Sequence, residues 1–302
     1  MQLKELAQTG RKIPEVGLGT WGYAGGPAPL QAGLDAGAGF IDTAESYGSE
    51  PVVADAIHDR REQVFLATKV SPAHFRRADL LKAADESLRR LRTDWIDLYQ
   101  LHRPNPKIPL AETLGALAEL VAAGKIRFIG VSNFNLALLQ HARQLLGKHP
   151  IVSNQIRYNL VDRTIEKDLL PYCHQQGITV IAYSPLCRDA QRLLDGDPRG
   201  VLRELAAATG KTAAQVALNW CLSRERVVVI PKGSSAAHVR ENCGASDWRL
   251  TAEQLQRLDE EIVFRRRGTI ESILRRCVPG RLVQPLRRLA AALPPALRRP
   301  FN

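Results

Sequence analysis

Polar residues stand at the ends of several short β-branched runs, where a buried parallel strand would otherwise hold apolar side chains. A carboxylate, an amine and an imidazole among them are groups that take part in acid–base chemistry. Because the carboxyl ends of the strands of a parallel barrel open on one face, residues that are distant in the sequence converge there. The residues are Asp42, Lys69, His102, Ser132, Asn133, Gln155, Tyr183, Ser184 and Lys232.

The elements that would position these residues alternate between short β-branched runs and longer helical stretches. Apolar residues recur at helical spacing, with Gly or Pro near the boundaries, at 78–91, 110–123 and 212–223. Eight strand–helix repeats in about 230 residues favour a closed (β/α)8 TIM barrel, an α/β fold with parallel strands, over an open sheet. The expected strands are 16–18, 40–42, 64–68, 96–101, 128–131, 151–155, 179–183 and 227–230.

The length of 302 residues suits one barrel domain with an additional tail. Before the first expected strand, residues 3–13 alternate in part and contain Thr9-Gly10, which predicts a short N-terminal β-hairpin at the end of the barrel. We therefore expect residues 1–264 to form the barrel and residues 265–302 to form an Arg-rich C-terminal extension.

The positive charge of the chain is concentrated in this extension. The whole chain carries +11, but residues 265–302 hold ten arginines and one acid, which leaves 32 basic and 30 acidic residues in 1–264. Nucleic-acid binding by the barrel is therefore not expected. In the tail, Pro285 could begin a short helix. One possibility is that the tail docks at the mouth of the barrel or is partly disordered. Contact with an anionic membrane surface, a nucleic acid or a partner is the other.

Composition also limits the compartment and the metal chemistry. The five cysteines lie far apart and form no C-x-x-C pair, so we expect reduced thiols and no disulfide framework, zinc site or other bound metal. No apolar run approaches the ~20 residues of a membrane-spanning helix, and the N-terminus lacks a signal-peptide core. The expectation is a cytoplasmic protein that is a monomer or a weak oligomer.

Two glycine-containing motifs invite a nucleotide-binding interpretation that their context does not support. Residues 17–22 match G-x-G-x-x-G, with Asp42 about 20 residues on, but the strand before them is very short and residues 23–29 stand where a helix should open. Gly210-Lys211-Thr212 looks like the end of a P-loop, but the position of its first glycine holds Leu205. Gly210 and Thr212 more simply end one helix and begin the next.

The chain resembles the aldo-keto reductase family from about residue 3 to residue 259, in order and without large gaps. The segments that carry the resemblance are GAGFIDTAESYG (37–48), ATKV (67–70), IDLYQLHRP (96–104), IGVSNF (129–134) and IPK (230–232). The resemblance implies a carbonyl reductase with the catalytic tetrad Asp42, Tyr47, Lys69 and His102.

The chemistry of these four groups agrees with carbonyl reduction. Hydride addition leaves an alkoxide, so a proton donor must stand ready, and Tyr47 would fill that role. An ammonium at Lys69 would lower the phenol's pKa, and Asp42 would keep that ammonium charged. His102 would hydrogen-bond the carbonyl oxygen. Taken singly, each has a structural alternative: a helix cap, a loop aromatic, a solvated strand end or a core imidazole.

The resemblance also implies a nicotinamide cofactor, NADPH, with NADH as an alternative. Tyr183 would stack on the nicotinamide, and Ser132, Asn133 and Gln155 would bind its carboxamide. Lys232 with two serines would surround a 2'-phosphate, although His238 stands where many relatives have arginine. The full set of expected cofactor residues is Gly19, Thr20, Asp42, Ser132, Asn133, Gln155, Tyr183, Ser184, Leu186, Ile230, Lys232, Gly233, Ser234, Ser235, His238, Glu241 and Asn242.

The substrate is expected to be a small carbonyl compound in a pocket formed by Trp21, Tyr47 and His102, with Tyr23 or Trp95 as further neighbours. Two other functions share this pattern. One is an NADPH-binding regulatory or redox-sensing subunit on the same fold. The other is an aldolase-type barrel that uses Lys69 as a Schiff-base nucleophile, against which the nearby carboxylate and phenol argue.

Overall fold

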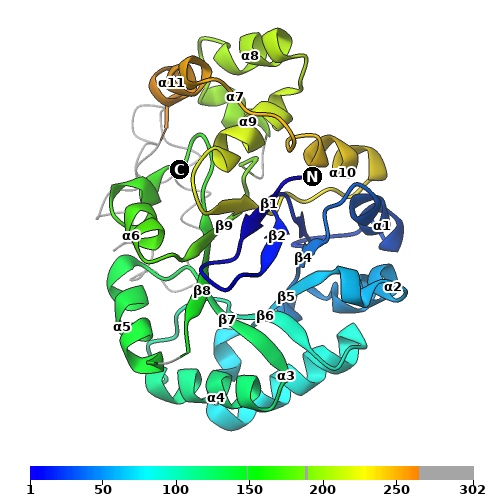
Figure 1. Ribbon diagram of the computed structural model, residues 1–302, viewed down its shortest axis with the longest axis vertical. Helices are drawn as coiled ribbons and strands as arrows, with labels where there is room; N and C mark the ends of the chain where they lie inside the picture. The colour runs from blue at the N-terminus through cyan, green and yellow to red at the C-terminus, as the bar shows by residue number, and fades with distance from the viewer. Residues whose placement is uncertain (148, 188–189, 265–302) are drawn as a thin grey trace, which may run out of the picture. The chain divides into compact units, whose positions relative to one another are not determined.

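A computed structural model describes residues 1–147, 149–187 and 190–264, and Met1–Phe264 form one compact unit. Its main sheet has eight parallel strands, ordered β10-β9-β8-β7-β6-β5-β4-β3, with helices packed around the outside (Figure 1). The predicted (β/α)8 barrel is confirmed. The strands are β3 (Leu18–Gly19), β4 (Phe40–Asp42), β5 (Phe65–Val70), β6 (Ile96–Leu101), β7 (Ile126–Ser132), β8 (Ile151–Arg157), β9 (Thr179–Tyr183) and β10 (Val227–Val229).

The first and last strands meet at a seam that closes the barrel. Val16 forms a parallel bridge with Val229, and the amide of Gly19 donates to the carbonyl of Pro231 at 3.1 Å. A Cβ atom at position 19 would lie 2.5 Å from the carbonyl oxygen of Ile230. Glycine is therefore required here, because the two chain segments approach too closely for any side chain.

The helices follow the strands in the alternating order that crossover connections require. Three of them, α7 to α9, lie between β9 and β10 and gather at the top of the view in Figure 1. None of the helices in the described part of the chain is long and apolar enough to cross a lipid bilayer. The helices are α1 (Pro27–Asp35), α2 (Glu50–Ile57), α3 (Arg77–Leu91), α4 (Leu110–Ala122), α5 (Leu136–Leu146), α6 (Leu169–Gln175), α7 (Ala190–Asp195), α8 (Val201–Thr209), α9 (Ala213–Leu222), α10 (Ala236–Cys243) and α11 (Ala252–Glu261).

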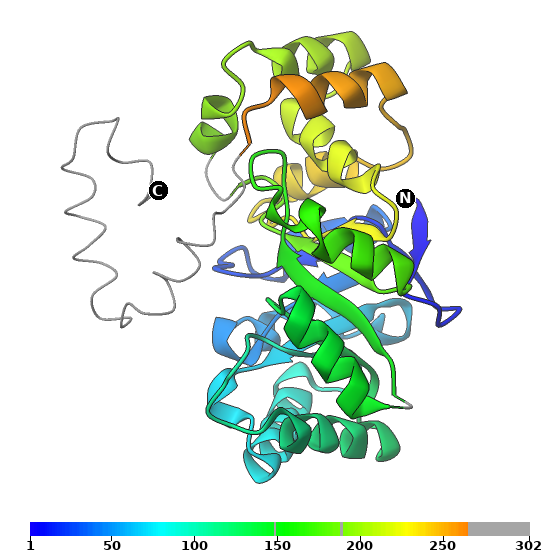
Figure 2. The same ribbon diagram turned by 90° about the vertical axis from the view of Figure 1, so that its left-hand side faces the viewer.

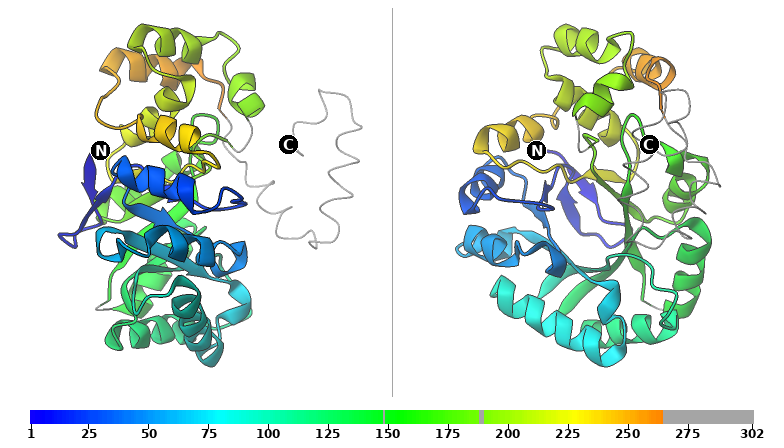
Figure 3. Two further views of the ribbon diagram at one scale, coloured as in Figure 1. Left: turned by 90° about the vertical axis from the view of Figure 1, so that its right-hand side faces the viewer. Right: turned by 180° about the vertical axis from the view of Figure 1, so that it is seen from behind.

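The predicted N-terminal hairpin is present and covers one end of the barrel. Strands β1 (Leu3–Glu5) and β2 (Lys12–Pro14) pair antiparallel, and Figures 2 and 3 show them at the end of the barrel where the N-terminus lies. Leu6 and Ile13 are fully buried and belong to the same apolar cluster as side chains from inside the barrel. The hairpin therefore closes the amino ends of the strands, and the site must lie at the opposite end.

The inside of the barrel changes from apolar to polar along each strand. In β4, Phe40 belongs to the interior cluster, and Asp42, two residues later, faces the same side. In β5 the same alternation runs from Phe65 to Lys69, and in β6 it runs from Leu98 to Gln100. An apolar layer thus supports a polar layer at the carboxyl ends of the strands.

The two glycine motifs are built as the sequence predicts. After residues 17–22, helix α1 begins only at Pro27, so no helix opens directly on the motif. Gly210 ends α8 with a left-handed backbone, and Thr212 begins α9 with a capping box. The predicted tail helix from Pro285 lies outside the described residues.

Candidate active site

The structure brings the four predicted catalytic residues together at the carboxyl ends of the strands. Asp42 is the last residue of β4, Lys69 lies near the end of β5, and His102 directly follows β6. Tyr47 lies in a short 3-10 turn, Glu45–Tyr47, that follows β4. Four side chains spread over some sixty residues of sequence thereby meet at one rim, as active sites of (β/α)8 barrels do.

Lys69 and Asp42 form a fully buried ion pair. The Lys69 ammonium donates to Asp42 Oδ1 at 2.6 Å and to the backbone carbonyl of Thr43 at 2.7 Å. Burial alone would lower the pKa of Lys69, but the Asp42 carboxylate and the Tyr47 hydroxyl more than offset it and raise that pKa above its ordinary value. Lys69 is therefore an ammonium at neutral pH. A Schiff-base nucleophile must instead be a neutral amine.

A pair of glutamine amides binds the second oxygen of Asp42. Gln155 Nε2 donates to Asp42 Oδ2 at 2.7 Å, and Gln100 Nε2 donates to the same oxygen at 3.2 Å. These bonds fix the carboxylate that holds Lys69. Gln100 was not predicted from the sequence, although a polar residue on an inward position of the otherwise buried run 96–101 is a recognisable signal.

Tyr47 lies against the other two groups. Its hydroxyl oxygen is 3.3 Å from His102 Nε2, and the Lys69 ammonium is 4.8 Å from the centre of its ring. Burial raises the pKa of Tyr47, and the Lys69 ammonium offsets only part of that rise. The ammonium thus acts on this pKa in the predicted direction, but the pKa is still raised overall, because desolvation of the phenolate outweighs the neighbouring charge.

His102 is held as a neutral imidazole. Burial, the Lys69 ammonium and the Arg103 guanidinium together lower its pKa to about 4. Its backbone carbonyl accepts a hydrogen bond from Asn133 Nδ2 at 3.2 Å, which ties the end of β6 to the end of β7. A neutral imidazole can donate one hydrogen bond from the nitrogen that faces Tyr47.

The lowered pKa of His102 predicts a pH-dependent stability. The unfolded imidazole titrates near its ordinary value of 6.5 and the folded one at about 4, so the unfolded chain binds up to one more proton between these values. The free energy of unfolding should therefore fall as pH decreases from 6.5 to 4. Urea unfolding across this range should show the fall reduced in His102→Gln but kept in the exposed control His141→Gln. Equal pH slopes in all three proteins would contradict the assignment.

The residues expected to bind the nicotinamide carboxamide are linked to one another and to the tetrad. Tyr183, at the end of β9, donates from its hydroxyl to Asn133 Oδ1 at 2.9 Å, which fixes the position of its half-buried ring. Ser132 Oγ donates to the carbonyl of Gln155 at 2.9 Å. Asn133 and Ser184 both have positive φ angles, 61° and 49°, in the turns that follow β7 and β9. These neighbouring strand ends place amide and hydroxyl groups beside one aromatic face.

Arg157 is a residue of this rim that the sequence reasoning missed. It ends β8, two residues after Gln155, and its guanidinium lies 5.8 Å from the centre of the Tyr183 ring. Its Nε is buried without a hydrogen-bond partner among the described residues. A buried charged group with an unused hydrogen-bond donor calls for an explanation, such as a bound ligand. The sequence could not identify Arg157 as such a group, because an arginine at the end of a predicted strand could equally be solvated.

The segment expected to meet the adenosine end lies against the loop between β3 and α1. The Lys232 ammonium is exposed and reaches the carbonyl of Gly22 at 3.4 Å. A Cβ atom at Gly25 would lie 2.7 Å from the carbonyl oxygen of Ser234, so the two loops are in contact. Ser235 caps α10 by accepting from the amide of His238 at 3.2 Å, and this bond leaves the hydroxyl proton able to donate.

The other predicted cofactor residues follow β3, β9 and β10 or lie on α10. Thr20 is buried and donates from its hydroxyl to the carbonyl of Asp42 at 3.1 Å, so it supports the β3–β4 junction. Ile230 and Asn242 are buried, whereas Leu186 and Glu241 are half-buried. Gly233 packs so tightly that an added Cβ would lie 2.7 Å from a side-chain carbon of Val239.

Of the aromatic residues expected near the substrate, one is placed on the wrong end of the barrel. Trp21, in the loop after β3, is 51% exposed, as the wall of an open pocket would be. Trp95 precedes β6 and lies between the guanidinium groups of Arg61 and Arg127, at 4.4 and 4.7 Å from its ring. The prediction that Trp95 neighbours the substrate is wrong, because it stands at the amino end of the strand whose carboxyl end leads to His102.

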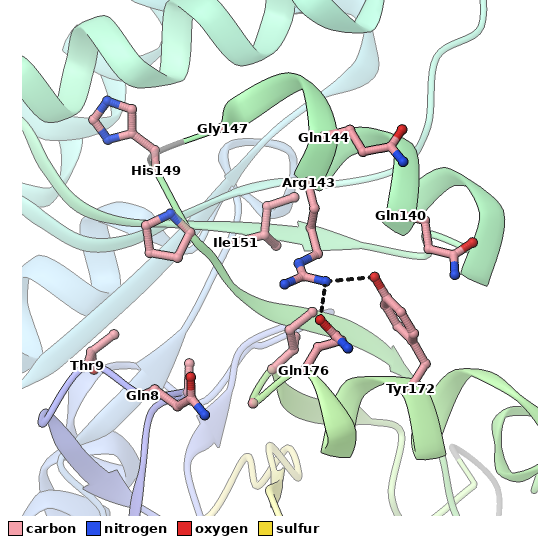
Figure 4. Close-up of a pocket in the computed structure, with 14 residues that line it drawn as sticks. Gln8, Thr9, Gln140, Arg143, Gln144, Gly147, His149, Ile151, Tyr172 and Gln176 are labelled. Carbon is pink, nitrogen blue, oxygen red and sulfur yellow. Dashed lines mark hydrogen bonds between the residues drawn. The ribbon is translucent and has the colours of Figure 1, made fainter.

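A separate polar pocket of about 800 Å3 lies at the amino end of the barrel. It is lined by the hairpin turn, α5, α6 and the segment before β8, and Figure 4 shows Arg143 at its centre. The Arg143 guanidinium donates to Tyr172 Oη and to Gln176 Oε1, both at 2.7 Å. These bonds link α5 to α6, and the pocket is remote from the tetrad at the carboxyl ends.

The barrel and its buried ion pair beside a phenol and a neutral imidazole define a barrel enzyme equipped for proton transfer. Residues 15–262 match the family model described as "Aldo/keto reductase family". The chain belongs to the aldo/keto reductase family, so it is an oxidoreductase.

Similar proteins cover nearly the whole barrel. The chain is 42% identical over 273 residues to methylglyoxal reductase YeaE of Escherichia coli, covering 86% of this chain and 95% of that protein. Among solved structures, a thermostable aldo-keto reductase in complex with the inhibitor epalrestat has 44% identity and a TM-score of 0.81, covering 86% and 99% of the two chains. An aldo/keto reductase of Klebsiella pneumoniae, in complex with NADP and acetate, has 41% identity and a TM-score of 0.78, covering 85% and 94%.

Proposed function

We propose that this protein reduces an aldehyde or ketone to the alcohol with NADPH, and that Tyr47 donates the proton. The observation that carries the proposal is the contact of the Tyr47 hydroxyl with His102 Nε2 at 3.3 Å beside the buried ammonium of Lys69. The bound cofactor would supply the hydride that attacks the carbonyl carbon. The residues of the chain then have to bind the carbonyl oxygen and protonate it as negative charge develops there.

Each tetrad residue has a defined part in this proposal. His102, neutral at working pH, donates to the carbonyl oxygen and orients it toward Tyr47. Tyr47 transfers its hydroxyl proton to that oxygen, and the Lys69 ammonium stabilises the phenolate left behind. Asp42, fixed by its amide donors, keeps Lys69 charged and aimed at the phenol. Tyr47 must then regain a proton from solvent before the next turnover.

The groups around the tetrad fit a nicotinamide dinucleotide. Tyr183 offers a half-buried ring held in place by Asn133, and an aromatic face suits a flat heterocycle. At the other end, Lys232 is an exposed cation close to the capped N-terminus of α10, and cations and helix N-termini both favour a phosphate. The aldo/keto reductase of Klebsiella pneumoniae reported above, which has NADP bound, supports the same choice of cofactor.

A steady-state assay of cofactor oxidation with a panel of aldehydes, ketones and sugars tests the proposal directly. The proposal expects turnover of at least one short aldehyde, with a higher kcat/KM for NADPH than for NADH. Tight NADPH binding without turnover of any carbonyl would instead favour the regulatory subunit. Borohydride trapping of a carbonyl on Lys69 would favour the aldolase-type barrel.

The preference for NADPH should depend on Lys232. We expect Lys232→Gln to lower the ratio of kcat/KM for NADPH over NADH by roughly tenfold, because one charge-assisted bond to the 2'-phosphate is lost. Lys82→Gln, which removes an exposed ammonium from α3, should leave the ratio unchanged. A Lys232→Gln enzyme with the wild-type ratio would show that the 2'-phosphate is bound elsewhere.

A further inference from the structure

Arg103 directly follows His102, and its backbone is fixed at the rim of the site. The amide of His102 donates to the carbonyl of Val70 at 3.1 Å. Two residues after Arg103, Asn105 Nδ2 donates to the carbonyl of Pro72 at 2.7 Å. With the bond from Asn133 to the His102 carbonyl, these contacts tie the loop after β6 to both neighbouring strand ends. The Cα atom of Arg103 is therefore held next to the tetrad.

The Arg103 side chain is exposed, and in the described part of the chain no ion pair or side-chain hydrogen bond uses its guanidinium. Some surface arginines are paired within the chain, as Arg76 is with Glu112 at 3.0 Å. The acid closest in sequence to Tyr47 is already bonded, since Glu45 Oε1 accepts from His74 Nδ1 at 3.0 Å. The N–H groups of the Arg103 guanidinium thus have no hydrogen-bond acceptor among the described residues.

The Arg103 guanidinium is also close enough to influence both Tyr47 and His102 electrostatically. Its positive charge is one of the causes that lower the pKa of His102, and it opposes the burial that raises the pKa of Tyr47. Arg103 is therefore an exposed cation that directly follows a tetrad residue in the loop after β6.

We propose that Arg103 binds a carboxylate of the substrate, so that the preferred substrates are short aldehydes or ketones that carry a carboxylate a few bonds from the carbonyl. This inference rests on the proposed function. A planar guanidinium matches a carboxylate with two parallel hydrogen bonds, and a fixed second contact orients the carbonyl toward the proton donor. Because the side chain is exposed, its attraction for the carboxylate is sensitive to salt.

The test compares matched pairs of carbonyl compounds with NADPH: succinic semialdehyde against butanal, and 4-carboxybenzaldehyde against benzaldehyde. The measured quantity is the ratio of kcat/KM for the acidic over the neutral member of each pair. We expect this ratio to exceed one in the wild type and to fall at least tenfold in Arg103→Gln, mainly through KM of the acidic compound. Arg103→Lys should keep part of the ratio, since it retains the charge but not the fork.

Two controls isolate the position of the charge. Arg11→Gln removes an exposed arginine from the hairpin at the other end of the barrel and should leave the ratio unchanged. Raising the ionic strength should lower the ratio in the wild type but much less in Arg103→Gln. A wild-type ratio below one, an unchanged ratio in Arg103→Gln, or a loss seen in Arg157→Gln instead would overturn the inference. Absence of NADPH oxidation with every compound would overturn the proposed function itself.

Discussion

Tyr47→Phe is expected to lower kcat for carbonyl reduction by about 10²- to 10⁴-fold, the range that a positioned general acid contributes. The substitution removes only the hydroxyl that lies 3.3 Å from His102 Nε2. The Lys69 ammonium keeps its bonds to Asp42 and to the Thr43 carbonyl, so the buried ion pair should survive. Steady-state kinetics would measure the loss, and fluorescence titration should show that NADPH still binds.

Tyr172→Phe is the matched control for this substitution. Its hydroxyl accepts from Arg143 (Figure 4), in the pocket at the amino end of the barrel. The same loss of one phenolic oxygen should leave kcat within about twofold, with a small stability cost typical of a lost hydrogen bond. Near-wild-type kcat in Tyr47→Phe would show that another group protonates the carbonyl oxygen.

Lys69→Met is expected to affect stability as well as rate. Removing the ammonium leaves the Asp42 carboxylate buried, with only the amides of Gln100 and Gln155 as donors. Breaking one side of a buried ion pair costs about 3–5 kcal/mol. Urea unfolding should detect this loss. Carbonyl reduction should fall at least as far as in Tyr47→Phe, because the buried ammonium beside the phenolate is then lost.

The double variant Asp42→Asn/Lys69→Met separates the two effects. It removes both charges, so much of the lost free energy of unfolding should return while carbonyl reduction stays lost. On the surface, Lys125→Met breaks the exposed ion pair with Asp85 and should cost less than about 1 kcal/mol. A double variant as unstable as Lys69→Met alone would mean that Lys69 stabilises the fold through packing rather than through its charge.

The fold was predictable because the strands carry a repeated local pattern. The strands expected at 40–42, 96–101 and 179–183 have the predicted bounds in the structure, since each is a buried run with clear flanking residues. The first and last strands are shorter than expected. Leu18–Gly19 and Val227–Val229 meet at a seam whose pairing depends on residues more than 200 positions apart, and local sequence does not encode that register.

Within the site, sequence predicted which residues gather but not how they bond. Gln155 was expected to serve a cofactor, yet its amide nitrogen also donates to Asp42 and so stabilises the ion pair. Gln100 and Arg157 were missed because a single polar residue in a strand carries no signal of its partner. Trp95 was expected near the substrate because it is close to His102 in the sequence. Strand β6 runs between the two residues and spans the barrel, so they lie at opposite ends of it. The orientation of a side chain depends on the direction of its strand and on which face of the strand it occupies. A sequence motif does not contain this information.

The seam between Val16 and Val229 has a consequence for the coupling of folding to ligand binding. It joins the two segments of the barrel that are furthest apart along the chain, so its closure carries the largest loop entropy of any strand pair. The loops that extend from it, around Gly22 and Lys232, are those proposed to hold the dinucleotide. A dinucleotide bound to both loops would connect the first and last strands across the seam. Saturation with it would then favour the closed cylinder over partly opened forms by mass action.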